Sequence, residues 1–192
     1  ADMFGPRVGF LKFKAAVEFN GVENIPGIVF ARGGAVAVLV ILECEGEEHT
    51  ILTRQARVPV GASAFAEIPA GMLDDEGHFG GVAAKELKEE TGLEIDASEL
   101  TDLSALATGD RYKGMFPSAG ACDEFIRLFE VRKSVTKEEL AAMHGRVHGE
   151  VEEGELIRLD IVPLDTLWRA TADAKTLCAL YLHEKLKAAG EL

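Results

Sequence analysis

The chain has 192 residues, of which 47% are hydrophobic and 28% charged, and its formal net charge is −13. This length and composition fit one domain of ordinary size with a sizeable core, and the acidic balance excludes a nucleic-acid binder, which would carry a basic surface. No apolar run approaches the roughly 20 residues of a membrane helix, and three scattered cysteines favour a reducing compartment, so we expect a soluble intracellular protein without membrane contacts.

The first thirty residues contain two extended pieces. Residues 7–19 alternate loosely between polar and apolar side chains and predict a strand that ends at the turn Asn20-Gly21, and residues 28–31 predict another strand. Neither piece has an obvious partner nearby, and unpaired strand edges are a liability. We expect both to pair, either in a small sheet or with another subunit.

The main core begins with residues 35–42, a continuous apolar run that suits a strand buried on both faces. A hairpin turn follows, and residues 49–58 return as the partner strand, which carries Arg54 and Arg57. An arginine at a strand end often extends its charge to solvent, but a guanidinium also binds phosphate through two parallel hydrogen bonds. We predict phosphate contact for Arg57 and leave both readings open for Arg54.

Residues 67–93 predict a strand, a tight glycine turn, an acidic loop and a helix that ends at Gly92. Glu86, Glu89 and Glu90 stand three and four residues apart, so they share one side of this helix. Like charges at that spacing destabilise a helix by some tenths of a kcal/mol unless a cation lies between them. Mg²⁺ binds such carboxylates and prefers sites that substrate phosphates complete, whereas composition alone would favour a solvated acidic surface.

The segment after this helix predicts a short strand at 103–107, a glycine-rich loop at 108–124 and a strand at 125–131. The loop is long for a mere connection, and long loops on compact domains tend to carry function. A capping box at Thr136 and Glu139 then predicts a short helix.

The last part of the chain begins with four glutamates between 150 and 155, which composition alone assigns to an acidic surface turn. A strand is predicted at 156–162, followed by a short helix and a final amphipathic helix at 172–189. We see no internal repeat and no domain boundary after residue 32.

The stretch 67–93 resembles the Nudix box, a pattern of one glycine, four glutamates, one arginine and a closing glycine at fixed spacing. The positions in register are Gly71, Glu86, Leu87, Glu89, Glu90, Gly92 and Leu93. Two positions depart from the pattern: Lys85 stands in place of the arginine, and Gly77 stands in place of the first glutamate, with Glu76 one residue earlier. The second departure predicts a lower metal affinity.

Motifs beyond the box resemble plant-type ADP-sugar diphosphatases, within the wider branch of ADP-ribose and nucleoside-diphosphate-sugar pyrophosphatases. They lie at 30–38, 57–59, 69–75, 116–120, 122–124 and 167–175. This resemblance implies an α/β fold, the Nudix α/β/α sandwich, over residues 33–192. It also implies that residues 1–32 form a small N-terminal β region exchanged across a homodimer, and it suggests a plastid in place of the cytoplasm.

The resemblance implies roles for individual residues. Metal ligands would be Glu86, Glu90, Glu89 beside them, the carbonyl of Ala70, and Glu155. The catalytic groups would be Glu153 or Glu155 as general base, together with Glu89. The substrate would contact Arg57, Arg54, Ser118 and Gly120. The implied cofactor is Mg²⁺, with Mn²⁺ as a substitute.

The implied reaction is hydrolysis of an ADP-sugar to AMP and a sugar 1-phosphate, and the sequence does not indicate which sugar. An ADP-ribose or GDP-mannose pyrophosphatase with the same chemistry is one alternative. A catalytically weak domain that binds a nucleotide as a sensor is another, and it is motivated by Gly77.

Overall fold

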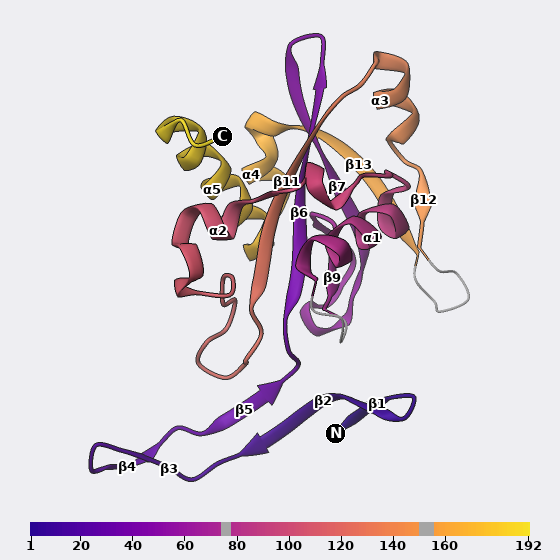
Figure 1. Ribbon diagram of the computed structural model, residues 1–192. Coiled ribbons are helices and arrows are strands. Elements are labelled where there is room, and N and C mark those ends of the chain that lie inside the picture. Colours follow the sequence, from indigo (N-terminus) through magenta and orange to yellow (C-terminus); the bar gives the residue numbers. More distant parts are fainter. Residues whose placement is uncertain (74–77, 150–155) are drawn as a thin grey trace.

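The computed structural model describes residues 1–73, 78–149 and 156–192 (Figure 1). A large mixed sheet lies between helices, and an arm of residues 1–31, called the N-terminal arm below, extends away from this body. The strands of the body are β6 (Ala35–Cys44), β7 (Glu47–Arg57), β8 (Ala62–Glu67), β9 (Ala70–Met72), β10 (Thr101–Asp102), β11 (Ile126–Ser134), β12 (Val147–His148) and β13 (Ile157–Pro163). Its α-helices are α1 (Phe79–Thr91), α2 (Leu103–Thr108), α3 (Lys137–Met143), α4 (Leu167–Ala170) and α5 (Ala174–Ala189).

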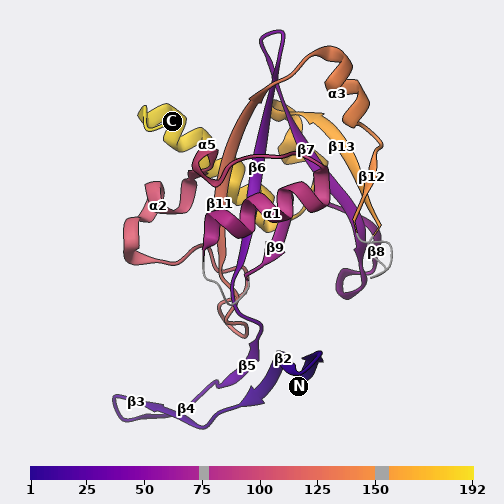
Figure 2. The same ribbon diagram turned by 45° about the vertical axis from the view of Figure 1, so that its right-hand side comes forward.

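Strand β6 divides the core into two halves, as its continuous apolar sequence predicts. Because side chains alternate across a strand, one set faces α2, α4 and α5 and the other faces α1. The first set is Ala35, Ala37, Leu39 and Ile41, and the second is Val36, Val38, Val40 and Leu42. Figure 2 shows α1 in front of the sheet and α5 behind it. The predicted α/β/α sandwich is confirmed.

The sheet follows the order β10-β11-β6-β7-β13-β12, with β8 beside β7 and β9 beside β6. Strand β11 runs parallel to β6, whereas β9 pairs with β6 in the antiparallel sense. In that register Val36 lies opposite Gly71, and Ala37 lies opposite Ala70. The glycine turn of the box is therefore fixed to the central strand β6 of the sheet.

The N-terminal arm forms its own sheets. Strands β1 (Asp2–Phe4), β2 (Arg7–Lys14) and β5 (Ile28–Ala31) make one sheet, and β3 (Val17–Phe19) and β4 (Val22–Ile25) make a hairpin. The strands of the arm thus pair with one another within the chain. The loop before β11 holds the base of the arm, since Phe30 N donates to Ala121 O (2.7 Å) and Arg32 N donates to Asp123 Oδ1 (2.8 Å).

Two sequence predictions are wrong in detail. Residues 103–107 form helix α2, because the Asp102 carboxylate caps it by accepting a hydrogen bond from Ala105 N (2.8 Å). Residues 7–19 do not form one strand: pairing breaks between β2 and β3, where Ala15 N donates to Gly27 O (2.8 Å). Over the described ranges, no helix has the length and apolar character to cross a membrane.

Candidate active site

Helix α1 brings the predicted metal-binding face of the box against β9. Its buried side chains Val82, Ala83 and Leu87 pack in the core half that faces α1. The helix ends at Gly92, whose left-handed backbone (φ 75°) lets its N–H donate to Lys88 O (2.8 Å). This packing turns Glu86 and Glu90, one helical turn apart, towards the strand that carries Ala70 and Gly71.

Gly71 is the point of closest approach between the turn and the helix. A Cβ atom at this position would lie 1.8 Å from Cδ of Glu86, closer than any real contact. The half-buried Glu86 carboxylate therefore occupies the space that any other residue would fill. A larger residue here would displace the Glu86 carboxylate from its place against the turn.

Glu90 is buried, with 6% of the residue exposed, and its Oε2 accepts a hydrogen bond from Ala70 N (3.0 Å). Burial raises the pKa of this carboxyl to about 8, and the neighbouring charges of Glu86 and Glu67 add to that effect. The Ala70 N–H and the Arg57 guanidinium act in the opposite direction and are outweighed. Two crowded carboxylates of this kind, one buried, fit a site that a divalent cation would neutralise.

Glu89 lies on the exposed side of the helix, where its carboxylate is 3.8 Å from Nζ of Lys85. Lys85, which stands in the arginine position of the box, therefore pairs with a neighbouring carboxylate. The structure brings Glu86 and Glu90 together with Ala70, and it leaves Glu89 more accessible. The metal and catalytic roles of Glu89 stay predictions.

Within 1–73, 78–149 and 156–192, no group of three or more His, Cys, Asp or Glu side chains has metal-binding geometry. Another carboxylate ligand predicted from the resemblance, Glu155, lies outside the described residues. The other general-base candidate, Glu153, and the departure at Glu76 and Gly77 also lie outside them.

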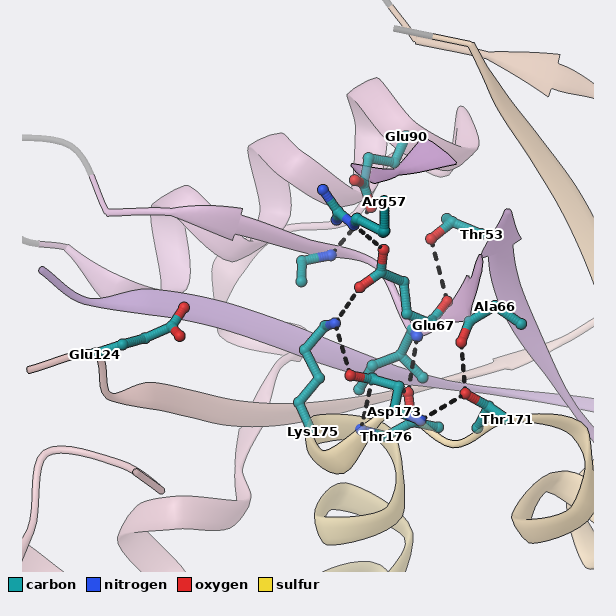
Figure 3. Close-up of polar contacts among 12 residues, drawn as sticks. Thr53, Arg57, Ala66, Glu67, Glu90, Glu124, Thr171, Asp173, Lys175 and Thr176 are labelled. Carbon is teal, nitrogen blue, oxygen red and sulfur yellow. Dashed lines mark hydrogen bonds and ion pairs between the residues drawn. The ribbon is translucent and has the colours of Figure 1, made fainter. Parts of the chain in front are cut away.

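Arg57, the predicted phosphate-binding residue, stands at the end of β7 beside Glu67. Its Nε donates to Glu67 Oε1 at 2.5 Å, and its side chain is 41% exposed. Figure 3 shows Arg57 between Glu90 and Glu67, with Lys175 on the other side of Glu67. The Lys175 ammonium pairs with Glu67 Oε2 and lies 3.1 Å from Asp173 Oδ1.

The other residues predicted to contact the substrate interact with different partners. The Nε of Arg54 pairs with Asp160 on β13. Ser118 and Gly120 are exposed in the loop before β11, where the Ser118 carbonyl accepts hydrogen bonds from Ala121 N (3.1 Å) and Cys122 N (2.9 Å). Their contacts with a substrate stay predictions.

Sequence reasoning did not single out Glu67, Asp173 and Lys175 as one charged cluster. Glu67 opens the box stretch, but Asp173 and Lys175 follow it by more than a hundred residues at the start of α5. The available signal was the motif at 167–175, which carries part of the resemblance and contains both residues.

Comparison with known proteins gives a match to the NUDIX domain model over residues 32–180. The chain is similar to Nudix hydrolase 14, chloroplastic, of Arabidopsis thaliana, with 45% identity over 98% of this chain and 62% of that protein. It is also similar to an ADP-ribose pyrophosphatase of Bacillus subtilis (32% identity, 81% of this chain, 76% of the relative). A methanol dehydrogenase activator of Bacillus methanolicus shares 34% identity over 80% of this chain and 75% of its own. The chain thus spans less than two thirds of the Arabidopsis relative.

Proposed function

Because the chain belongs to the NUDIX domain family, we propose that it hydrolyses the diphosphate bond of ADP-sugars of the ADP-glucose kind, giving AMP and a sugar 1-phosphate. The observation that carries the proposal is the pair Glu86 and Glu90, held against Ala70 and Gly71 with Arg57 beside them. Anionic carboxylates and a guanidinium side by side suit a ligand that combines a divalent cation with phosphate groups.

The metal in this proposal is Mg²⁺, with Mn²⁺ as a substitute. Glu86, Glu90, the Ala70 carbonyl and Glu155 would hold it, with Glu89 near the same helix face. When bound, it would neutralise the phosphate oxygens and favour the deprotonated form of a water ligand. Since the pKa of Glu90 is raised to about 8, this carboxyl must release a proton to become a ligand, so the metal binds more tightly as pH rises towards 8.

The remaining steps belong to the side chains. Arg57 binds a phosphate oxygen and orients the diphosphate, and Arg54, Ser118 and Gly120 contact more distant parts of the substrate. Glu153 or Glu155 accepts a proton from the attacking water. A new P–O bond forms from that water as the bond to the bridging oxygen breaks, and the bridging oxygen leaves with one phosphate.

A second substrate is favoured by a specific observation, since the Bacillus subtilis relative is named an ADP-ribose pyrophosphatase. ADP-glucose, ADP-ribose and GDP-mannose should therefore be compared with Mg²⁺ present, by measuring the release of nucleoside monophosphate. The proposal expects the highest kcat/KM for ADP-glucose. Preference for another sugar would correct the substrate, and binding without any release would indicate a nucleotide sensor.

We also propose that the protein is a homodimer in which residues 1–32 are a separate β region, exchanged between copies, and 33–192 the catalytic domain. The support is the number of large apolar side chains exposed on the N-terminal arm, because large apolar patches are uncommon on monomers and often mark an interface. The exposed side chains are Met3, Val8, Leu11, Phe13, Val17, Phe19, Val22, Ile28 and Phe30.

We propose a plastid as the location of the protein, and the name of the Arabidopsis relative supports this.

A further inference from the structure

We infer that Lys175, which lies on the C-terminal helix, is a positioning residue for Arg57 and acts on it through Glu67. This inference rests on the proposed function, because it concerns the phosphate-binding role of Arg57. Its basis is a line of three charged groups: Arg57 Nε pairs with one oxygen of Glu67, and the Lys175 ammonium pairs with the other. Figure 3 shows this line running from the N-terminus of α5 to the vicinity of Glu90.

The three side chains differ sharply in exposure. Glu67 is 4% exposed and Lys175 is 10% exposed, whereas Arg57 is 41% exposed. The inner pair is therefore largely shielded from bulk water, and Arg57 is the group best exposed to meet a dissolved ligand. A buried carboxylate is stable only when charges and hydrogen bonds compensate it, and two cations do so here.

The backbone on either side of Glu67 is anchored to the N-terminus of α5 and to the residues just before it, and these contacts bring Lys175 to Glu67. Ile68 N donates to Thr176 Oγ1 (3.0 Å), and Thr171 Oγ1 donates to Ala66 O (2.5 Å). Asp173 caps α5 by accepting a hydrogen bond from Thr176 N (3.0 Å). These contacts fix the start of α5 against the strand end on both sides of Glu67.

The arrangement has a consequence for charge. If Glu67 had Arg57 as its only counter-ion, the buried carboxylate would cancel the guanidinium and draw it away from solvent. Lys175 shares its charge between Glu67 and Asp173, so it neutralises Glu67 only in part. Because Arg57 is then not the only counter-ion of Glu67, more of its positive charge is left for an anion. The bond at Nε then fixes the plane of the guanidinium, whose terminal amino groups are the ones that meet a phosphate.

The test measures binding of inorganic pyrophosphate in the presence of Mg²⁺ by calorimetry, a probe that needs neither nucleoside nor sugar. The variants are Arg57→Ala, Lys175→Met and the double variant. Lys187→Met is the matched control, because Lys187 lies on the same helix and pairs with Glu48 at an exposed position. Lys175→Gln replaces Lys175→Met if the latter does not fold, and melting curves are recorded for all variants.

We expect Arg57→Ala to weaken binding by roughly 10- to 100-fold and Lys175→Met by about tenfold. The double variant should bind no more weakly than Arg57→Ala alone, because both changes remove one coupled interaction. Lys175→Arg should restore most of the affinity, and Lys187→Met should leave it unchanged.

Each contrary outcome has a distinct meaning. If Arg57→Ala weakens binding but Lys175→Met lowers only the melting temperature, Lys175 is structural and the inference is overturned while the proposed function stands. Additive effects in the double variant would overturn it as well. If Arg57→Ala leaves the affinity for pyrophosphate unchanged, the phosphate-binding role of Arg57 fails, and the inference fails with it.

Discussion

The active-site region and the N-terminal arm depart from ordinary folding in opposite directions. At the site, charged groups are buried: taken as whole residues, Glu90 is 6% exposed and Glu67 is 3% exposed. On the arm, apolar groups are exposed: Phe19 is 67% exposed and Val22 is 60% exposed. Globular chains normally bury the apolar groups and expose the charged ones.

Both departures are unfavourable for an isolated chain, and each is relieved by a different kind of partner. A buried carboxylate is relieved by a cation, and this supports the proposal that the site takes a metal ion. An exposed apolar strand is relieved by another apolar surface, so the arm is suited to a second protein chain. The buried carboxylates thus indicate a cation as their partner, whereas the exposed apolar side chains of the arm indicate a protein surface.

The largest effect should come from the helix carboxylates. Glu86→Gln and Glu90→Gln should each lower kcat by roughly a hundredfold or more with the fold intact, because each removes a charge from the metal site. Turnover of ADP-glucose at saturating Mg²⁺ measures this. Glu94→Gln is the control, since Glu94 is exposed just beyond the same helix and pairs with Lys88. Near-normal turnover by either site variant would exclude the proposed metal site.

The same burial predicts a gain in stability for the metal-free protein. The pKa of Glu90 is raised in the folded state, so ionising it opposes folding as pH rises from about 4.5 to about 8. Glu90→Gln should therefore raise the free energy of unfolding on the order of 2–4 kcal/mol at pH 8, and by little near pH 4.5. Urea titrations in EDTA at several pH values measure this. A pH-independent difference would contradict the raised pKa.

On the arm, the corresponding change is to place a charge on the apolar surface. Phe19→Asp should weaken the proposed homodimer by roughly 30-fold or more, as expected for loss of a central aromatic contact. Sedimentation at micromolar concentration should show twice the chain mass for the unaltered protein and a shift to monomer for the variant. Trp168→Ser, an exposed aromatic outside the arm, should leave the mass unchanged. A monomer in both cases would remove the dimer from the proposal.

The smallest effect should come from Glu89, the exposed carboxylate of the same helix. Glu89→Gln should lower kcat about tenfold or less, because water screens an exposed charge and Lys85 already pairs with it. Comparing its Mg²⁺ requirement with that of Glu90→Gln sharpens the contrast between the two neighbours. An equal loss in both variants would show that exposure in the free protein does not rank these ligands.

Much of this contrast could be read from the sequence. The spacing of the box glutamates indicated a carboxylate-rich helix side, and the apolar run at 35–42 indicated a strand buried on both faces. Glu89 and Glu90 are about 100° apart around the helix, but spacing alone could not tell which of the two faces the sheet. Only the packing of α1 against β9 decides which of them is buried.

Other features lay beyond local pattern. The run 103–107 is apolar and short, so periodicity cannot distinguish strand from helix, and the decisive cap at Asp102 precedes it. The contact between Glu67 and Lys175 joins segments that are far apart in the chain, and no local rule predicts which helix end meets which strand end. Which segments meet in space depends on the topology of the whole chain, whereas periodicity is a local property of the sequence.

Strand β6 continues the N-terminal arm directly into the sheet, and this continuity has a mechanical meaning. Its first three residues pair with β9, and nine of its residues pair with β11. A pull on the arm acts along the length of β6, so these hydrogen bonds are sheared together and do not open one at a time. An arm anchored to another body would therefore transmit force to the strand that carries Ala70 and Gly71 before it could peel away.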